Sequence, residues 1–193
     1  IPINMASFRT GPNQYFRLLP LSALESLSLY EGPGSVVSGS GAMGGVVHAT
    51  TLDARDQPKV SAQLGANSAD ASQHGMLIAS SRHATHPVVM GAQITRHDIL
   101  HSSGRTPWPA SDFSEFNGFL KADLTLTPTQ RLIAFASFSG VDGAGRTDRL
   151  GQGDIRWYDN SMMVTYLRWL YQPAKSWVRT ARVTPHVQYL QEG

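Results

Sequence analysis

Histidines are the residues of this sequence best suited to bind a metal ion or a haem group, because imidazole nitrogens ligate both. The sequence has seven, and His97 and His101 stand at the start of a long polar stretch, residues 98–114. A metal centre needs two or more ligands that converge and are held by neighbouring groups. Ordinary solvated turn histidines are the simpler interpretation, so we expect no resident metal ion and no cofactor. His97 and His101 are candidates for contact with a bound ligand.

A second polar stretch, residues 140–160, concentrates charged and aromatic side chains. It contains Arg146, Arg149, Trp157 and Tyr158. The charges can form ion pairs within a surface loop, where each pair contributes little stability. Alternatively, the stretch can present a polar and aromatic surface to a ligand. These four residues are therefore the second group of ligand-binding candidates.

Catalytic residues are not predicted. The sequence has no cysteine, which excludes a cysteine nucleophile, thiolate metal ligands and disulfides. Its serines and aspartates do not form a G-x-S-x-G elbow or a comparable nucleophile motif. Cysteine-dependent and hydrolytic catalysis are therefore not expected.

A glycine-rich segment, residues 39–44, matches the G-x-G-x-x-G pattern of dinucleotide-binding loops. Such a loop leads into a helix whose N-terminus receives the pyrophosphate. Here it leads into residues 45–51, Gly-Val-Val-His-Ala-Thr-Thr, which favour a strand because they are rich in β-branched side chains. A phosphate-binding P-loop is excluded as well, because no Lys-Ser or Lys-Thr follows the glycines. The simplest interpretation is a tight glycine turn between two strands.

Alternation of apolar and polar residues is the main structural signal. It is clearest at residues 116–126, where Leu120 and its even-numbered neighbours share one face while Lys121 and its odd-numbered neighbours share the other. The same reasoning predicts strands at 24–31, 46–51, 59–66, 73–81, 87–96, 130–139, 164–171 and 178–190. The expected fold class is therefore all-β, with about seven strands after residue 58.

The connections between the expected strands differ in length. A short turn at 127–129 contrasts with the long loops at 98–114 and 140–160. Short turns at one end and long loops at the other are typical of an antiparallel transmembrane β-barrel. A soluble β-sandwich with two long surface loops would look similar. Trp108, Trp157, Trp169 and Trp177 near strand ends fit an interfacial girdle in a barrel, or the core or rim of a soluble sheet.

Composition narrows the class of protein further. Charged residues make up only 16% of the chain and hydrophobic residues 41%, which suits sheets with weakly polar faces better than a charge-coated soluble domain. The net charge of +2 is too small, and the basic residues too scattered, to indicate nucleic-acid binding. No window approaches the roughly 20 apolar residues of a membrane-spanning helix.

Residues 24–36 and 39–47 together resemble the end of the plug domain of TonB-dependent outer-membrane receptors. That family commonly reads I-E-R-I-E-V-x-R/K-G-P-x-S, followed by Y-G-S-x-A-x-G-G-V. This chain has L-E-S-L-S-L-Y-E-G-P-G-S-V, followed by G-S-G-A-M-G-G-V-V, and residues 8–15 are similar to the preceding plug segment. The matching motif residues are Gly32, Pro33, Gly39, Gly41, Gly44 and Gly45.

The resemblance implies a domain organisation and a function. Residues 1–52 would be the C-terminal part of a plug domain, and residues 53–193 the N-terminal portion of a β-barrel with about seven strands. So few strands would form an incomplete barrel, and we expect the chain to be an internal piece of a larger receptor. Such receptors actively import an iron chelate (siderophore), haem or cobalamin across the outer membrane of Gram-negative bacteria.

The resemblance also implies partners. These are TonB, acting through an N-terminal box that would precede Ile1, an extracellular ligand, and the lipid of the outer membrane, with no nucleic acid. The alternative is a soluble or surface-attached β-sandwich binding module that shares only a glycine turn. It would fold alone in water as a monomer, whereas a receptor piece would need detergent.

Overall fold

A computed structural model of the chain describes residues 18–32, 45–54, 59–81, 83, 85–101, 106–145, 157–174, 177 and 179–192. Within these residues the chain is all-β, with antiparallel strands in two sheets and one short 3-10 helix. None of the helical structure in this part of the chain is long and apolar enough to cross a membrane. The expected all-β class is confirmed.

The first sheet is a two-stranded hairpin. The 3-10 helix η1 (Leu21–Ala23) leads into β1 (Leu24–Glu31), which pairs with β2 (Gly45–Thr51). β1 has the predicted bounds, and β2 begins one residue earlier than predicted. At the far end of the hairpin Glu31 pairs with Gly45, whose φ is +152°, and Gly32 follows with a φ of +102°. L side chains rarely adopt these values, so both glycines are required by the backbone.

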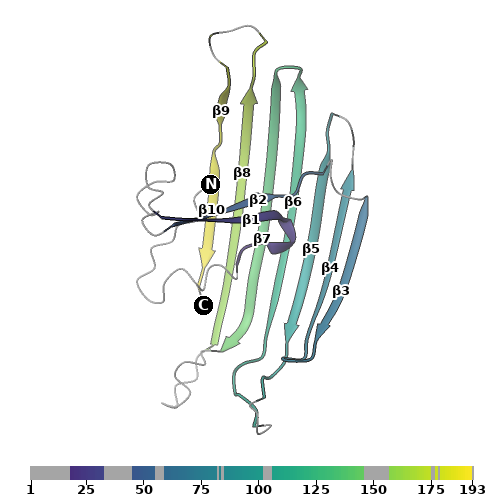
Figure 1. The fold of residues 1–193 in the computed structure, drawn as a ribbon, viewed down its shortest axis with the longest axis vertical. Helices are drawn as coiled ribbons and strands as arrows, with labels where there is room; N and C mark the ends of the chain where they lie inside the picture. Colours follow the sequence, from purple (N-terminus) through teal and green to yellow (C-terminus); the bar gives the residue numbers. More distant parts are fainter. Residues whose placement is uncertain are drawn as a thin grey trace.

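The second sheet has eight strands. In chain order they are β3 (Val60–Asn67), β4 (Ser72–Ser81), β5 (Val88–His97), β6 (Phe113–Thr127), β7 (Gln130–Gly145), β8 (Trp157–Tyr171), β9 (Ala181–Val183) and β10 (His186–Gln191). Their order across the sheet is β10-β8-β7-β6-β5-β4-β3, with β9 also paired to β8 (Figure 1). Each of β3 to β8 therefore lies beside its neighbour in the sequence, as in a meander. The connections after β3, β5 and β7 all leave from one end of the sheet.

Several strand bounds differ from those predicted. β6 begins at Phe113, inside the expected loop 98–114. β7 and β8 extend further than predicted, so residues 140–145 and 157–160 of the expected loop 140–160 belong to strands, and residues 146–156 lie outside the described residues. The last expected strand, 178–190, is divided into β9 and β10 around Pro185. Proline has no backbone N–H to donate to the ladder, and here its carbonyl oxygen accepts a bond of 3.1 Å from Leu167 N.

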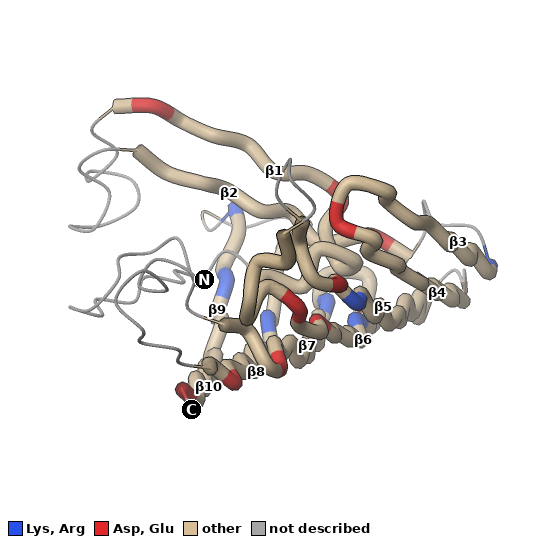
Figure 2. The backbone as a smooth tube through the Cα atoms, turned by 90° about the horizontal axis from the view of Figure 1, so that it is seen from below, with Lys and Arg blue, Asp and Glu red and all other residues tan. Residues whose placement is uncertain are grey.

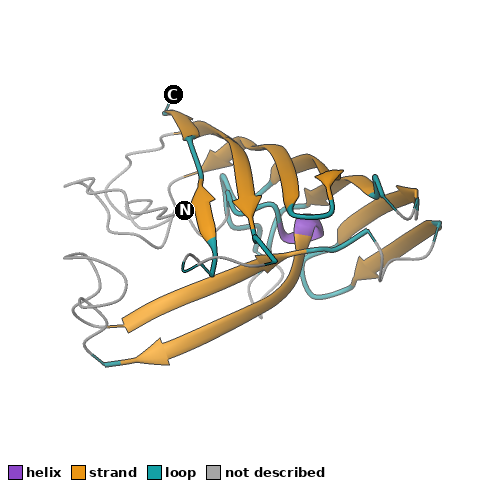
Figure 3. Ribbon diagram, turned by 90° about the horizontal axis from the view of Figure 1, so that it is seen from above, coloured by secondary structure: helices purple, strands orange, loops and turns teal. Residues whose placement is uncertain are grey.

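The hairpin lies across one face of the eight-stranded sheet, and its far end reaches beyond β10 (Figures 1 and 3). Figure 2 shows β1 and β2 as a layer separate from the larger sheet. At its base, Leu52 N donates to the Ala23 carbonyl oxygen at 2.9 Å. Ala23, Leu52 and Ala54 form one buried cluster with Ile78, Val89, Phe119 and Phe135 of the sheet.

Strand register assigns each side chain to one of two faces, because directly opposed residues of an antiparallel pair point the same way. The inner face, toward the hairpin, is largely polar, with Gln63, His74, Gln93, Lys121, Ser137, Arg168 and Gln188 from successive strands. The outer face is apolar and exposed, with Leu64, Leu77, Ile94, Leu120, Phe138, Leu167 and Val187 in turn. In the described residues no other element covers the outer face.

Gly91 gives a test of this packing. A Cβ at Gly91 would lie 2.6 Å from Cε1 of the buried Phe119 ring and 3.0 Å from the Leu77 carbonyl oxygen. Gly91→Ala is therefore expected to lower the free energy of unfolding by about 1–3 kcal/mol, as overpacking does. Urea unfolding followed by tryptophan fluorescence measures the change.

Gly118→Ala is the matched control. Gly118 lies on the neighbouring strand but on the outer face, where the nearest atom to a new Cβ is 3.6 Å away. Its effect should stay within about 0.5 kcal/mol. Equal losses for the two variants would contradict the assignment of Gly91 to the packed face.

Candidate functional site on the inner face

Three inward residues of β6 contact the base of the hairpin: Asn117, Phe119 and Lys121. Alternation places them in a row on the inner face, each two residues from the next. Ser22 Oγ, in η1, donates a hydrogen bond to Asn117 Oδ1. Phe119, only 6% exposed, belongs to the same buried cluster as Ala23, Leu52 and Ala54. The hairpin base is thus attached by a polar contact and by an apolar one.

Lys121 makes the third attachment. Its Nζ donates to the Thr51 carbonyl oxygen at 3.2 Å, to Thr51 Oγ1 at 3.0 Å and to the Leu52 carbonyl oxygen at 2.7 Å. An ammonium group has three donors, so all of its capacity is used at the end of β2. The carboxylates of Asp53, Asp123 and Glu25 also attract this ammonium group.

Further charged residues line the inner face beside Lys121. Arg131 forms a bidentate ion pair with Asp123, which is buried. The guanidinium carbon of Arg168 lies 5.3 Å from the centre of the Tyr166 ring, within cation–π range. The Nε of Arg168 is buried and has no hydrogen-bond partner among the described residues. These charged groups make this part of the inner face polar.

His97, the first predicted ligand-binding residue, is held between two carboxylates. It is the last residue of β5, and its Nδ1 lies 3.2 Å from Asp70 Oδ2 in the turn after β3. Its Nε2 lies 3.8 Å from Glu115 Oε2 on β6, and its ring stacks on Phe113 with the centroids 4.1 Å apart. His97 thus joins three segments at the end of the sheet from which the long connections leave.

The other predicted ligand-binding residues belong to different segments of the chain, and some lie outside the described residues. His101 is exposed and pairs through its backbone with Pro107. Trp157 and Tyr158 were expected in a loop, but they are the first two residues of β8 and pair with Gly145 and Ala144. Arg146 and Arg149 lie outside the described residues, as do the motif residues Pro33, Gly39, Gly41 and Gly44. Among the described residues no group of three or more His, Cys, Asp or Glu side chains could hold a metal ion.

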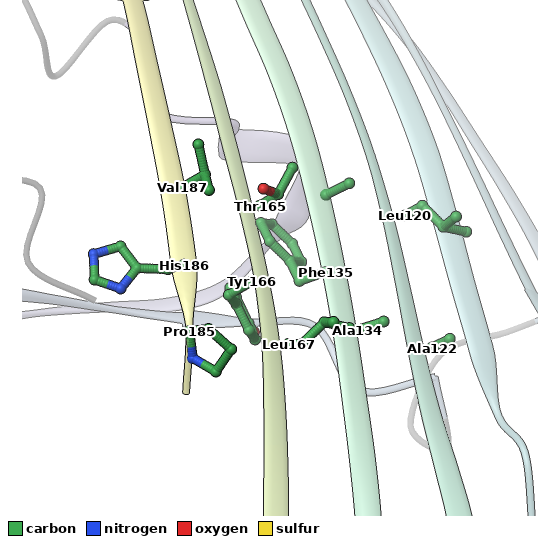
Figure 4. A pocket seen from close by; sticks show the side chains of 11 residues that line it. Leu120, Ala122, Ala134, Phe135, Thr165, Tyr166, Leu167, Pro185, His186 and Val187 are labelled. Carbon is green, nitrogen blue, oxygen red and sulfur yellow. The ribbon is translucent and has the colours of Figure 1, made fainter. Parts of the chain in front are cut away.

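A shallow hollow of about 420 Å³ lies between β6 and β10 (Figure 4). The small residues Ala122, Ala134 and Ala136 create it between the larger side chains of Leu120 and Leu167. Ligand sites normally combine an apolar lining with several convergent polar groups. This hollow is open and almost wholly apolar, so it does not have the chemistry of a site for a polar ligand.

Sequence reasoning missed the residues that attach the hairpin. The alternation at 116–126 placed Asn117 and Lys121 on the polar face, and that was the available signal. It did not reveal their partners, because Ser22 and Thr51 are 95 and 70 residues away in the sequence. Asp70 and Glu115 were likewise not singled out, since their link to His97 depends on strand pairing.

The chain was also compared with known proteins. No protein-family model matches it, and no curated protein matches it.

Asp70 provides a pH-dependent test of the His97 cluster. Hydrogen bonds from Ser72, the largest effect, and from His97 lower the pKa of Asp70 from 3.8 to about 2. Because the folded pKa is depressed, the stabilisation is present above pH 3.8 and is lost as the pH falls through about 2. Carboxyl ¹³C NMR titration should show the Asp70 pKa rising toward 3.8 in both Ser72→Ala and His97→Ala, and more in Ser72→Ala. An unchanged pKa in His97→Ala would contradict the contact.

Proposed function

We propose that this chain is part of a TonB-dependent outer-membrane receptor. Residues of η1, β1 and β2 would belong to the end of its plug, and β3 to β10 to the wall of a transmembrane barrel that is incomplete here. The whole receptor would import a scarce ligand such as an iron chelate, haem or cobalamin, with TonB as the energising partner. The chain would perform no catalytic chemistry of its own.

One observation carries the proposal, namely the exposed apolar outer face. On β5 the even-numbered residues from Met90 to Arg96 are exposed, while the odd-numbered ones are half-buried or buried. Ile94 is 62% exposed and Leu120, near the middle of β6, is 48% exposed. An apolar surface continuous over seven strands is unfavourable in water. A lipid environment is the solvent that suits it, with the polar face turned to the interior.

The aromatic residues of β8 support a membrane-spanning length. Trp157 and Trp169 are 12 positions apart (169 − 157) and share the outer face by alternation. At about 3.3 Å per residue they are separated by about 40 Å along the strand. A strand tilt of about 45° projects this to about 28 Å, close to the roughly 25 Å apolar band of outer-membrane barrels. Tyr171 stacks on Trp169 and adds a second aromatic ring at this end of β8.

The arrangement of the hairpin and of the connections also supports the proposal. A plug must contact the interior of its barrel, and the β1–β2 hairpin contacts the polar face. The two longest connections of the larger sheet, after β5 and β7, leave from one end, while the two-residue turn between β6 and β7 lies at the other end, as does the connection after β8. The two longest connections fit external loops, and the two-residue turn fits a periplasmic one.

The competing function is a soluble β-sandwich binding module. A sandwich buries an apolar sheet face against a second sheet. In the described residues the second sheet instead lies on the polar face, and the apolar face is left uncovered. This observation favours the receptor over the sandwich.

Paired arginine substitutions test the membrane assignment. Ile94→Arg puts a charge on the outer face of β5, and it should cost about 2–4 kcal/mol of unfolding free energy near the bilayer centre. Gln93→Arg puts the same charge on the inner face, where water and polar groups solvate it, so it should cost less than about 1 kcal/mol. Urea unfolding of the protein in phospholipid vesicles measures both.

The outcome separates the two functions. A soluble module would tolerate Ile94→Arg on a surface exposed to water, and the wild-type protein would not associate with vesicles at all. Either result would contradict the receptor. Recovery of the wild-type gene product in the outer-membrane fraction of a Gram-negative host is the corresponding test in cells.

A further inference from the structure

We propose that Asn117, Phe119 and Lys121, here named the β6 clamp, hold the hairpin to the sheet. Within the clamp, the hydrogen bonds of Lys121 must break before the base of the hairpin can separate from the sheet. The clamp is a feature of this chain's own contacts and does not depend on the proposed function. The further idea, that the clamp opens when a plug moves, rests on the proposed receptor function.

Contacts with the larger sheet are unevenly distributed along the hairpin. In the middles of β1 and β2, Leu27 and Leu29 are exposed on one side, and His48 is exposed on the other beside the half-buried Ser28. The base, by contrast, has the Ser22–Asn117 bond, the buried cluster and the three bonds of Lys121. In the described residues the hairpin is thus held mainly at one end.

Lys121 differs in kind from its two neighbours in the clamp. Phe119 contributes apolar packing, which is not directional. The three ammonium bonds are directional and charge-assisted, and all of them end on Thr51 and Leu52. Their acceptors are the last carbonyl oxygens of the hairpin, at Thr51 and Leu52, where the chain leaves β2 for the larger sheet. Separation of the hairpin base from the sheet therefore requires the hydrogen bonds of Lys121 to break.

Nearby charges also act on the Lys121 ammonium group. Its partial burial opposes the charge, whereas Glu25 of β1 and Asp53 after β2 attract it from the hairpin side and Asp123 attracts it from the sheet side. Arg168 is the cation that repels it. The hairpin thus places two carboxylates and three neutral oxygens near this ammonium group, and a neutral side chain of similar length would lose their attraction.

The clamp can be tested with a buried thiol, because the chain has no cysteine of its own. Ala54 is 4% exposed and lies at the hairpin base, so Ala54→Cys reports opening of that base. The labelling rate with a water-soluble maleimide follows the population of the open form when opening is rapid. In the Lys121→Met background the rate should rise about tenfold or more, which corresponds to about 1.4 kcal/mol of lost attachment. Lys121→Arg should restore slow labelling.

Controls separate the clamp from a general loss of folding. Lys59→Met removes an exposed lysine just before β3 and should leave labelling slow. Circular dichroism must show unchanged strand content in each variant. If Lys121→Met does not fold, Thr51→Val, which removes only the Oγ1 acceptor, should still accelerate labelling by a smaller factor. Labelling of Lys121→Met or Thr51→Val at the wild-type rate would overturn the clamp, whether or not the protein proves to reside in a membrane.

Discussion

The register between neighbouring strands determines which residues of the larger sheet can meet the hairpin and which cannot. Successive side chains of a strand point to opposite faces, so a slip of one residue would exchange the two faces completely. The pairing of Lys121 with Val89 on one side and with Phe135 on the other keeps all three on the inner face. The same register holds Leu120, Met90 and Ala136 on the outer face. The same strand register therefore places the residues that attach the hairpin on the inner face and the apolar residues on the outer face.

This constraint explains how a sheet with few charged residues can still have two chemically different faces. Most of the inward positions of β6 are polar or charged, and most of the outward ones are apolar. Arg131 neutralises Asp123 from the adjacent strand, which makes the burial of Asp123 tolerable. Phe119 interrupts the polar row where η1 and the end of β2 supply an apolar partner. The inner face thus offers the hairpin base polar and apolar contacts in alternation along β6.

Much of the fold could be predicted because period-two alternation is a local signal. β1 was predicted to the residue, and the alternation of 116–126 identified both faces of β6 correctly. The end of β7 and the start of β8 could not be predicted. Gly140 has a weak strand preference and is held in β7 by pairing with Ser161. The bulge between Val141 and Ala144 is also invisible in the sequence.

The site was less predictable than the fold for the same reason. His97 could be singled out by residue type, but its partners Asp70 and Glu115 come from a turn and a strand that only the register brings beside it. Trp157 and Tyr158 were assigned to a loop, although pairing with Ala144 and Gly145 makes them part of β8. The glycine motif was recognisable because Gly32 and Gly45 occupy backbone conformations open to few other residues. The resemblance to receptor plugs stays a prediction.

The most direct test of the account is the environment of successive residues along β6. Single cysteines can be introduced at each position from 116 to 125 of this cysteine-free chain and spin-labelled in membranes. Collision with oxygen, which dissolves in lipid, and with a charged nickel complex, which stays in water, then reports the surroundings of each label. A lipid-facing outer surface predicts high oxygen and low nickel accessibility at the even-numbered positions only, with a period of two. Even-numbered labels that meet nickel freely, or that meet neither reagent, would contradict a lipid-facing outer surface.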